Sequence, residues 1–143
     1  MLERSNHCVY SIHYHLVFPV KYRKALLRGE IERSLFHISK EFEERYEIEI
    51  EKLGADNDHI HLLCSLHPKY SIGQTVHLYK NVTAKQLFRH HPDLRKELWG
   101  GEFWTDGYYA ATVGERGNWE VVKNYILKQG KKLEDVNLRL FEF

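Results

Sequence analysis

Two segments of this chain alternate apolar and polar residues with a period of two, which restricts them to β-strands. In residues 59–66 one face would carry Ile60, Leu62, Cys64 and Leu66, and the other His59, His61, Leu63 and Ser65. The imidazoles of His59 and His61 would then stand on one face, about 6–7 Å apart along the strand. This arrangement is half of a site for a divalent metal, suited to Zn, Mn, Ni or a partly hydrated Mg ion. Two solvent-exposed strand histidines would give the same pattern.

The second alternating segment, residues 7–18, predicts a long strand that ends at Pro19. It carries a rival pair, His13 and His15, also on the polar face. Only the acidic residues before His59 separate the two pairs, because Asp56-Asn57-Asp58 could orient imidazoles from behind.

The remaining elements follow from periodicity and from turn and cap residues. We expect a helix over 23–45 with a break near Gly29, a strand over 47–53, a turn over 54–58, a helix from 71 to 90, a short helix or turn over 93–98, strand-like segments at 103–104 and 108–113, and a last helix over 119–129. The order β-α-β-β-α-β-α predicts a single domain over 1–143 of the α+β class. Its ferredoxin-like antiparallel sheet would have helices packed mainly on one face, and a C-terminal helix would follow.

Composition places the chain among ordinary globular proteins. Its 143 residues are 43% hydrophobic and contain no apolar run long enough for a membrane span or a signal peptide. Cys8 and Cys64 both fall in strand-like patterns. We expect a cytoplasmic protein with buried thiols, and a single disulfide between them is the alternative.

The net charge of +1 does not indicate a nucleic-acid partner, but the charges are segregated. Six glutamates lie between residues 41 and 51, whereas other segments are basic and contain aromatic residues. The candidate DNA-binding residues are Lys21, Arg23, Lys80, Lys85 and Arg89, with aromatic rings at Tyr22, Trp99, Phe103, Trp104, Tyr108 and Tyr109 for stacking on unpaired bases. The alternative is that the basic residues are solvated helix faces and the aromatic residues are core.

The last predicted helix places Tyr125 and Gln129 one turn apart on the same face. The Gln129 carbonyl is a possible hard oxygen ligand, and the Tyr125 phenol is a possible nucleophile. Alternatively, Tyr125 is a packing residue, one of nine tyrosines. The sequence has no Walker-type phosphate loop, so we expect no nucleotide cofactor. Phosphoryl chemistry without a nucleotide is compatible with a covalent protein–phosphate intermediate, which conserves the energy of the broken phosphate ester bond for rejoining.

Four segments together resemble the HUH (His-hydrophobe-His) single-tyrosine transposases of the insertion-sequence 200/605 type. These segments are His15-Leu16-Val17-Phe18 with Lys21-Tyr22-Arg23, then Asp58-His59-Ile60-His61-Leu62-Leu63, then Leu98-Trp99-Gly100-Gly101-Glu102-Phe103-Trp104 with Gly107-Tyr108-Tyr109 and Thr112-Val113-Gly114, and last Tyr125-Ile126 with Gln129. Only the pair His59 and His61 occupies the position of the metal motif in this family.

The resemblance implies a metal-dependent transposase that acts on single-stranded DNA hairpins at the ends of a mobile element. His59, His61 and Gln129 would bind Mg²⁺ or Mn²⁺. Tyr125 would attack the DNA, form a 5′-phosphotyrosine and release a 3′-hydroxyl for rejoining. The protein would act as a homodimer in which the helix of one protomer can complete the site of the other.

The sequence departs from the family at Lys80-Asn81-Val82-Thr83-Ala84, where a Lys-Gly-x-Ser-like stretch is common, and this departure concerns the hairpin contacts. A second hypothesis is a domesticated hairpin-binding protein without transposition activity. A third, a relaxase-like HUH nuclease of rolling-circle replication, is disfavoured by the small size of the chain.

Overall fold

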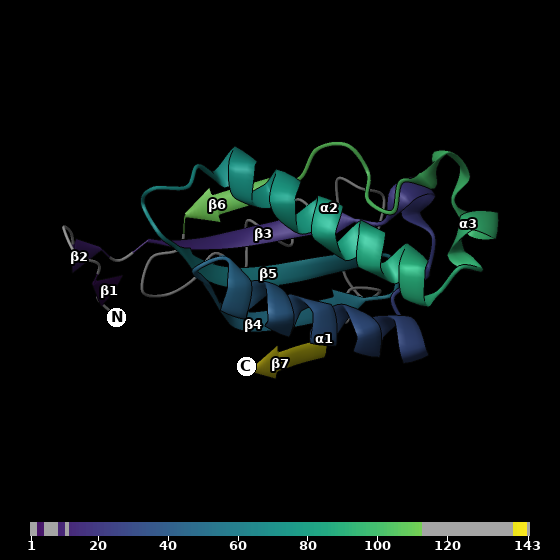
Figure 1. Ribbon diagram of the computed structural model, residues 1–143, viewed down its shortest axis with the longest axis horizontal. Helices are drawn as coiled ribbons and strands as arrows, with labels where there is room; N and C mark the ends of the chain where they lie inside the picture. The colour runs from purple at the N-terminus through teal and green to yellow at the C-terminus, as the bar shows by residue number, and fades with distance from the viewer. Residues whose placement is uncertain (1–2, 5–8, 11, 113–138, 143) are drawn as a thin grey trace, which may run out of the picture.

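The computed structural model describes residues 3–4, 9–10, 12–112 and 139–142 of the chain. The predicted last helix, with Tyr125 and Gln129, lies outside the described residues. Helices and strands below carry the labels of Figure 1.

The central element of the fold is a five-stranded antiparallel sheet with the strand order β6-β3-β5-β4-β7. Its strands are β3 (His13–Pro19), β4 (Ile48–Asp56), β5 (His59–Leu66), β6 (Tyr109–Thr112) and β7 (Arg139–Glu142). Helix α1 (Gly29–Arg45) connects β3 to β4, and α2 (Ile72–His90) leads from β5 towards β6. Both helices cross the same face of the sheet (Figure 1). The α+β prediction with a ferredoxin-like order and helices on one face is therefore confirmed.

Smaller elements flank this unit. Strands β1 (Glu3–Arg4) and β2 (Val9–Tyr10) pair only with each other among the described residues, so the strand predicted over 7–18 joins the main sheet only from His13. A 3₁₀ turn, η1 (Lys21–Arg23), follows β3. Helix α3 (Leu94–Glu97) and a second 3₁₀ turn, η2 (Trp99–Gly101), lie between α2 and β6.

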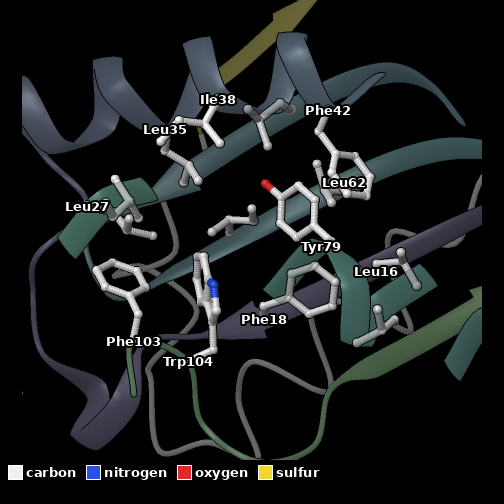
Figure 2. Close-up of a cluster of buried hydrophobic side chains, with 14 of the residues drawn as sticks. Leu16, Phe18, Leu27, Leu35, Ile38, Phe42, Leu62, Tyr79, Phe103 and Trp104 are labelled. Carbon is white, nitrogen blue, oxygen red and sulfur yellow. The ribbon is translucent and has the colours of Figure 1, made fainter. Parts of the chain in front are cut away.

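The pairing register of β3 and β5 decides which residues enter the core. Leu16 lies opposite Leu62 and Phe18 opposite Ile60, so the apolar faces of both strands point towards the helices. Figure 2 shows Phe18 and Leu62 on the side of the sheet that faces Leu35, Ile38 and Phe42 of α1 and Tyr79 of α2. The core is therefore a single layer between the sheet and the two helices.

The prediction for the first helix was wrong at its beginning, because α1 starts at Gly29 rather than at residue 23. Residues 21–23 form the 3₁₀ turn instead, and Tyr22 and Arg23 adopt left-handed backbone angles that cannot continue an α-helix. The predicted break near Gly29 marks the true start of the helix. For α2, Ser71 and Gln74 form a capping box in which each side chain bonds the backbone N–H of the other residue.

The turn expected over 54–58 is shorter in the structure, because β4 continues through Gly54 and Ala55 to Asp56. Backbone pairing with β5 and with β7 holds this part of β4 extended, so the hairpin turn is only Asn57-Asp58. A β-bulge between Ile50 and Lys52 interrupts the alternation of side chains along β4, which lets both Ile50 and Leu53 enter the core.

The structure corrects one other expectation, the strand at 103–104, and confirms another, the buried thiol of Cys64. Phe103 and Trp104 are buried, but they form only an isolated bridge between Trp104 and Val20 instead of a strand. Cys64 is a free, buried thiol, and burial raises its pKa to about 12. No helix among the described residues has the length and apolar character needed to cross a bilayer.

Helices α1 and α2 are joined in the core by a hydrogen bond between the Ser39 and Tyr79 hydroxyls, at 2.8 Å. The Tyr79 oxygen points towards α1 in Figure 2. We expect Tyr79→Phe to lower the free energy of unfolding by about 1–3 kcal/mol, because it leaves the buried Ser39 hydroxyl without this partner. Urea denaturation would measure the loss. In the Tyr79→Phe protein, Ser39→Ala should lower the free energy of unfolding much less than it does in the wild type. Equal losses in the two proteins would contradict the coupling of the two hydroxyls.

Candidate metal centre

His59 and His61 lie on the face of β5 that points away from α1 and α2, since the residues that alternate with them, Ile60 and Leu62, enter the core. Both imidazoles are buried, with only 2% of His59 and 8% of His61 exposed. The alternative of two solvent-exposed strand histidines is therefore wrong. A buried polar ring requires partners or a ligand, which makes the contacts of these two rings informative.

Asp58 determines the orientation of the His59 ring. His59 Nδ1 lies 2.9 Å from Asp58 Oδ1, so the N–H donates to the carboxylate and Nε2 keeps its lone pair. The other carboxylate oxygen, Oδ2, accepts from the Arg23 guanidinium at 3.3 Å. The backbone also fixes this turn, because Val20 N donates to the Asp58 carbonyl at 2.8 Å. The predicted orienting role of the acidic residues before His59 is thus visible in the contacts of Asp58.

His61 contacts a second histidine from the neighbouring strand. Its Nε2 lies 3.4 Å from His15 Nδ1, and the two ring centroids are 4.8 Å apart in an edge-to-face arrangement. Burial lowers the pKa of His61 to about 4, with smaller contributions from His15 and His59. Burial also lowers the pKa of His15. Both rings are therefore neutral at pH 7, the state in which imidazole binds a metal.

The strand register also separates the two His-x-His pairs. His13 Nδ1 lies 2.5 Å from Glu51 Oε1, whereas His15 lies against His61. In β4 the residue opposite His61 is Gly54, so no β4 side chain stands directly across from this ring. The space beside His61 is bounded by His15 on one strand and by the backbone of Gly54 on the other.

The described residues fit a divalent metal. His59 Nε2 and His61 Nδ1 are buried and have no hydrogen-bond partner among the described residues. Asp56, Asp58 and His59 also offer ligand atoms that all lie within 4.8 Å of one another. Orphaned imidazole nitrogens beside carboxylates are donors for Mn²⁺, Mg²⁺ or Zn²⁺, and the Nδ1 bond of His59 is the support that metal-binding histidines usually have. The arrangement could bind a metal and hold a phosphate against it.

Sequence reasoning did not assign His15 or Arg23 to this centre, although it gave Asp56-Asn57-Asp58 an orienting role. Apart from the family resemblance, Arg23 was considered only for DNA binding, and His15 only as part of the rival pair. The missing information was the register, because only the pairing of Val17 with His61 places His15 diagonally beside the metal motif.

The candidate DNA-binding residues occupy different environments. Lys85 and Arg89 are exposed on α2. Lys21 pairs with Glu102 at 2.8 Å. The Lys80 ammonium is half-buried and donates to the carbonyls of Thr105 and Gly107, and burial lowers its pKa. Lys80 thus fastens the loop before β6 to α2, and DNA binding by all five residues stays a prediction.

A family model described as "Transposase IS200 like" matches residues 8–129. The chain is similar to the ISDra2 transposase TnpA of Deinococcus radiodurans, at 33% identity over 92% of this chain and 93% of that protein. It is also similar to the transposase for insertion sequence element IS200 of Salmonella typhimurium, at 32% identity over 86% of this chain and 80% of the relative.

Solved structures give the same picture of the fold. A putative transposase from Deinococcus radiodurans R1 matches with a TM-score of 0.80 and 29% identity, over 89% of this chain and 97% of that one. A REP-associated tyrosine transposase bound to a REP hairpin matches with a TM-score of 0.55, over 95% of this chain and 80% of that one. Its identity is 13%, so this second likeness concerns the fold alone.

The carboxylate of Asp58 can be tested without removing a candidate histidine ligand. We expect Asp58→Asn to weaken Mn²⁺ binding by roughly 10- to 100-fold, because the amide removes the charge that supports His59 and pairs with Arg23. Titration of the protein with Mn²⁺, followed by electron paramagnetic resonance, measures the free ion. The matched control is Asp93→Asn, which changes an exposed aspartate paired with Lys96. Equal affinities in the two variants would contradict the role of Asp58.

Proposed function

Because the chain belongs to the IS200-like transposase family, we propose that it cleaves and rejoins single-stranded DNA at hairpins that mark the ends of a mobile element. The observation that carries this proposal is the buried pair His59 and His61, each of which has one ring nitrogen without a hydrogen-bond partner among the described residues, while Asp58 holds the other ring nitrogen of His59. A site of this kind suits a phosphate ester, because the ester is anionic and unreactive until its charge is offset.

In the proposed centre, His59 and His61 hold Mg²⁺ or Mn²⁺, and Gln129 supplies the third protein ligand. Asp56, which lies in the same carboxylate–histidine group, is a second candidate for the third ligand. When bound, the ion would polarise the scissile phosphate and offset its charge. Asp58 keeps the Nε2 lone pair of His59 directed away from the hairpin turn that carries the carboxylate, and Arg23 holds Asp58 in place.

The proposed nucleophile is Tyr125. Its phenolic oxygen forms a bond to the scissile phosphorus, and the bond from phosphorus to the 3′ oxygen breaks. The products are a 5′-phosphotyrosine and a free 3′-hydroxyl. In the second step a 3′-hydroxyl of the same or another strand attacks the phosphotyrosine, which restores the DNA phosphodiester and releases the tyrosine. Each step exchanges one phosphate ester bond for another, so no nucleotide cofactor is needed.

The proposed substrate is a DNA hairpin with unpaired flanks, and the proposed assembly is a homodimer. A structural relative, the REP-associated tyrosine transposase, is bound to a REP hairpin, which supports a hairpin as the ligand of this fold. In the dimer, the helix that carries Tyr125 and Gln129 would complete the metal half-site of the other protomer.

We expect wild-type protein with Mn²⁺ and a single-stranded hairpin oligonucleotide to give a covalent protein–DNA adduct on a denaturing gel. Tyr125→Phe should abolish the adduct and leave hairpin binding within about twofold, because only the hydroxyl is removed. The matched control is Tyr70→Phe, which changes a half-buried tyrosine in the turn between β5 and α2 and should form the adduct normally.

Two results would contradict this proposal. An adduct formed by Tyr125→Phe would mean that another tyrosine is the nucleophile. Hairpin binding by the wild type without any adduct would favour the second hypothesis, a hairpin-binding protein without transposition activity.

Mixing two inactive variants tests whether the site is shared between protomers. His61→Ala alone should lose metal-dependent cleavage, as Tyr125→Phe does. If the tyrosine acts on the partner's metal half-site, a heterodimer of the two variants contains one intact site, and mixing should restore up to about a quarter of the wild-type adduct at statistical exchange. No recovery after exchange, shown with differently tagged subunits, would place His61 and Tyr125 of one protomer in the same site.

A further inference from the structure

Two aromatic side chains from distant parts of the sequence lie together on the surface. Tyr22 is 54% exposed and Trp99 is 76% exposed, and their ring centroids are 6.1 Å apart with the planes at 59°. Single exposed aromatic residues are common, but a contiguous exposed pair has lost the burial that stabilises large rings. An exposed aromatic pair of this kind is a candidate binding surface.

The backbone on both sides of this pair is held in unusual conformations. Tyr22 has φ 60° and Arg23 has φ 53°, the left-handed region that bulky residues avoid. The strand-to-turn geometry is fixed by Lys21 N, which donates to the Phe103 carbonyl at 2.8 Å. After Trp99, Gly100 has φ 80°, which a glycine adopts without strain. The rings are therefore presented by a rigid support.

Two ion pairs link the segments that carry the rings. Lys21 contacts Glu102 at 2.8 Å, and Lys24 contacts Glu97 at 3.4 Å. In each segment, one ion-paired residue precedes the ring in sequence and the other follows it. Figure 1 shows that α3 lies at the same end of the molecule as the segment after β3. Each of these lysines is paired with a carboxylate, and the Lys21 ammonium also lies 5.8 Å from the centroid of the Tyr22 ring. An aromatic surface whose neighbouring charges are already paired suits a flat, uncharged partner better than a phosphate or an acidic peptide.

The aromatic pair is connected to the candidate metal centre. Arg23, the residue after Tyr22, donates to the Asp58 carboxylate, and Asp58 in turn accepts from His59. A DNA strand whose phosphate lies at His59 would therefore bring neighbouring nucleotides towards Tyr22 and Trp99. The flat, uncharged faces of such a strand are its unpaired bases.

We propose that Tyr22 and Trp99 form a stacking platform for one unpaired base that flanks the scissile phosphate. This inference rests on the proposed function and adds to it the recognition of a base at a fixed distance from the cleaved bond. Stacking on aromatic rings tolerates any base, so the platform selects for an unpaired nucleotide rather than for a sequence.

The test measures hairpin affinity in chelator, so that no cleavage occurs, with oligonucleotides in which each flanking nucleotide in turn is abasic. We expect Trp99→Ala to bind the intact oligonucleotide about tenfold more weakly than the wild type does. One of the abasic oligonucleotides should bind the wild type about tenfold more weakly than the intact one does. Trp99→Ala should bind that abasic oligonucleotide and the intact one with the same affinity. Trp99→Phe should recover part of the affinity, and Tyr70→Ala is the matched control. The loss should be the same at low and high salt, because stacking releases no counterions.

Three results would overturn the platform. The first is a Trp99→Ala variant that binds the hairpin with wild-type affinity. The second is a loss of affinity in Trp99→Ala that adds fully to the loss from every abasic position. The third is a Trp99→Ala variant that no longer dimerises but keeps its DNA affinity, which would make the rings a contact between two copies of the chain. An adduct assay on the wild type separates the proposals. If the wild type forms the adduct and any of the three results is found, only the platform is rejected. If the wild type binds no hairpin, both the platform and the proposed function are rejected.

Discussion

The antiparallel pairing of β3 with β5 is the constraint on which the rest of the structure depends. It joins the two alternating segments at the middle of the sheet, with Leu16 opposite Leu62 and Val17 opposite His61. Since side chains alternate along each strand, one register places the apolar residues under the helices and the histidines on the other face. A slip by one residue would bury imidazoles in the core and expose leucines, so stability and the candidate site select the same register.

The hairpin turn between β4 and β5 carries the second essential contact. Asp58 is bound to the segment after β3 through its backbone carbonyl and through Arg23, and to His59 through its other carboxylate oxygen. One aspartate thus connects the metal half-site to the strained turn at Tyr22. This connection gives the aromatic pair and the candidate metal centre a fixed relation, as the proposed base platform requires.

Much of the fold could be predicted from local signals. The alternation over 59–66 and the start of the second helix at residue 71 are set by neighbouring residues, and both were predicted in place. The start of α1 and the end of β4 were not, because they depend on partners far along the chain. Gly54 reads as a turn residue in the sequence, but pairing with β5 and β7 holds it in a strand.

The sequence alone determined the order of the main elements from β3 to β6, the family resemblance and the His-Ile-His motif, because periodicity and motif spacing are local properties. It did not predict β7, whose residues 139–142 were expected to be part of a short charged tail. Only the tertiary structure decided what surrounds the His-Ile-His motif. The register brought His15 to His61, the docking of the turn brought Arg23 to Asp58, and the approach of α3 to the end of β3 brought Trp99 to Tyr22. These contacts join residues that are distant in the chain, and no local pattern encodes which of them meet.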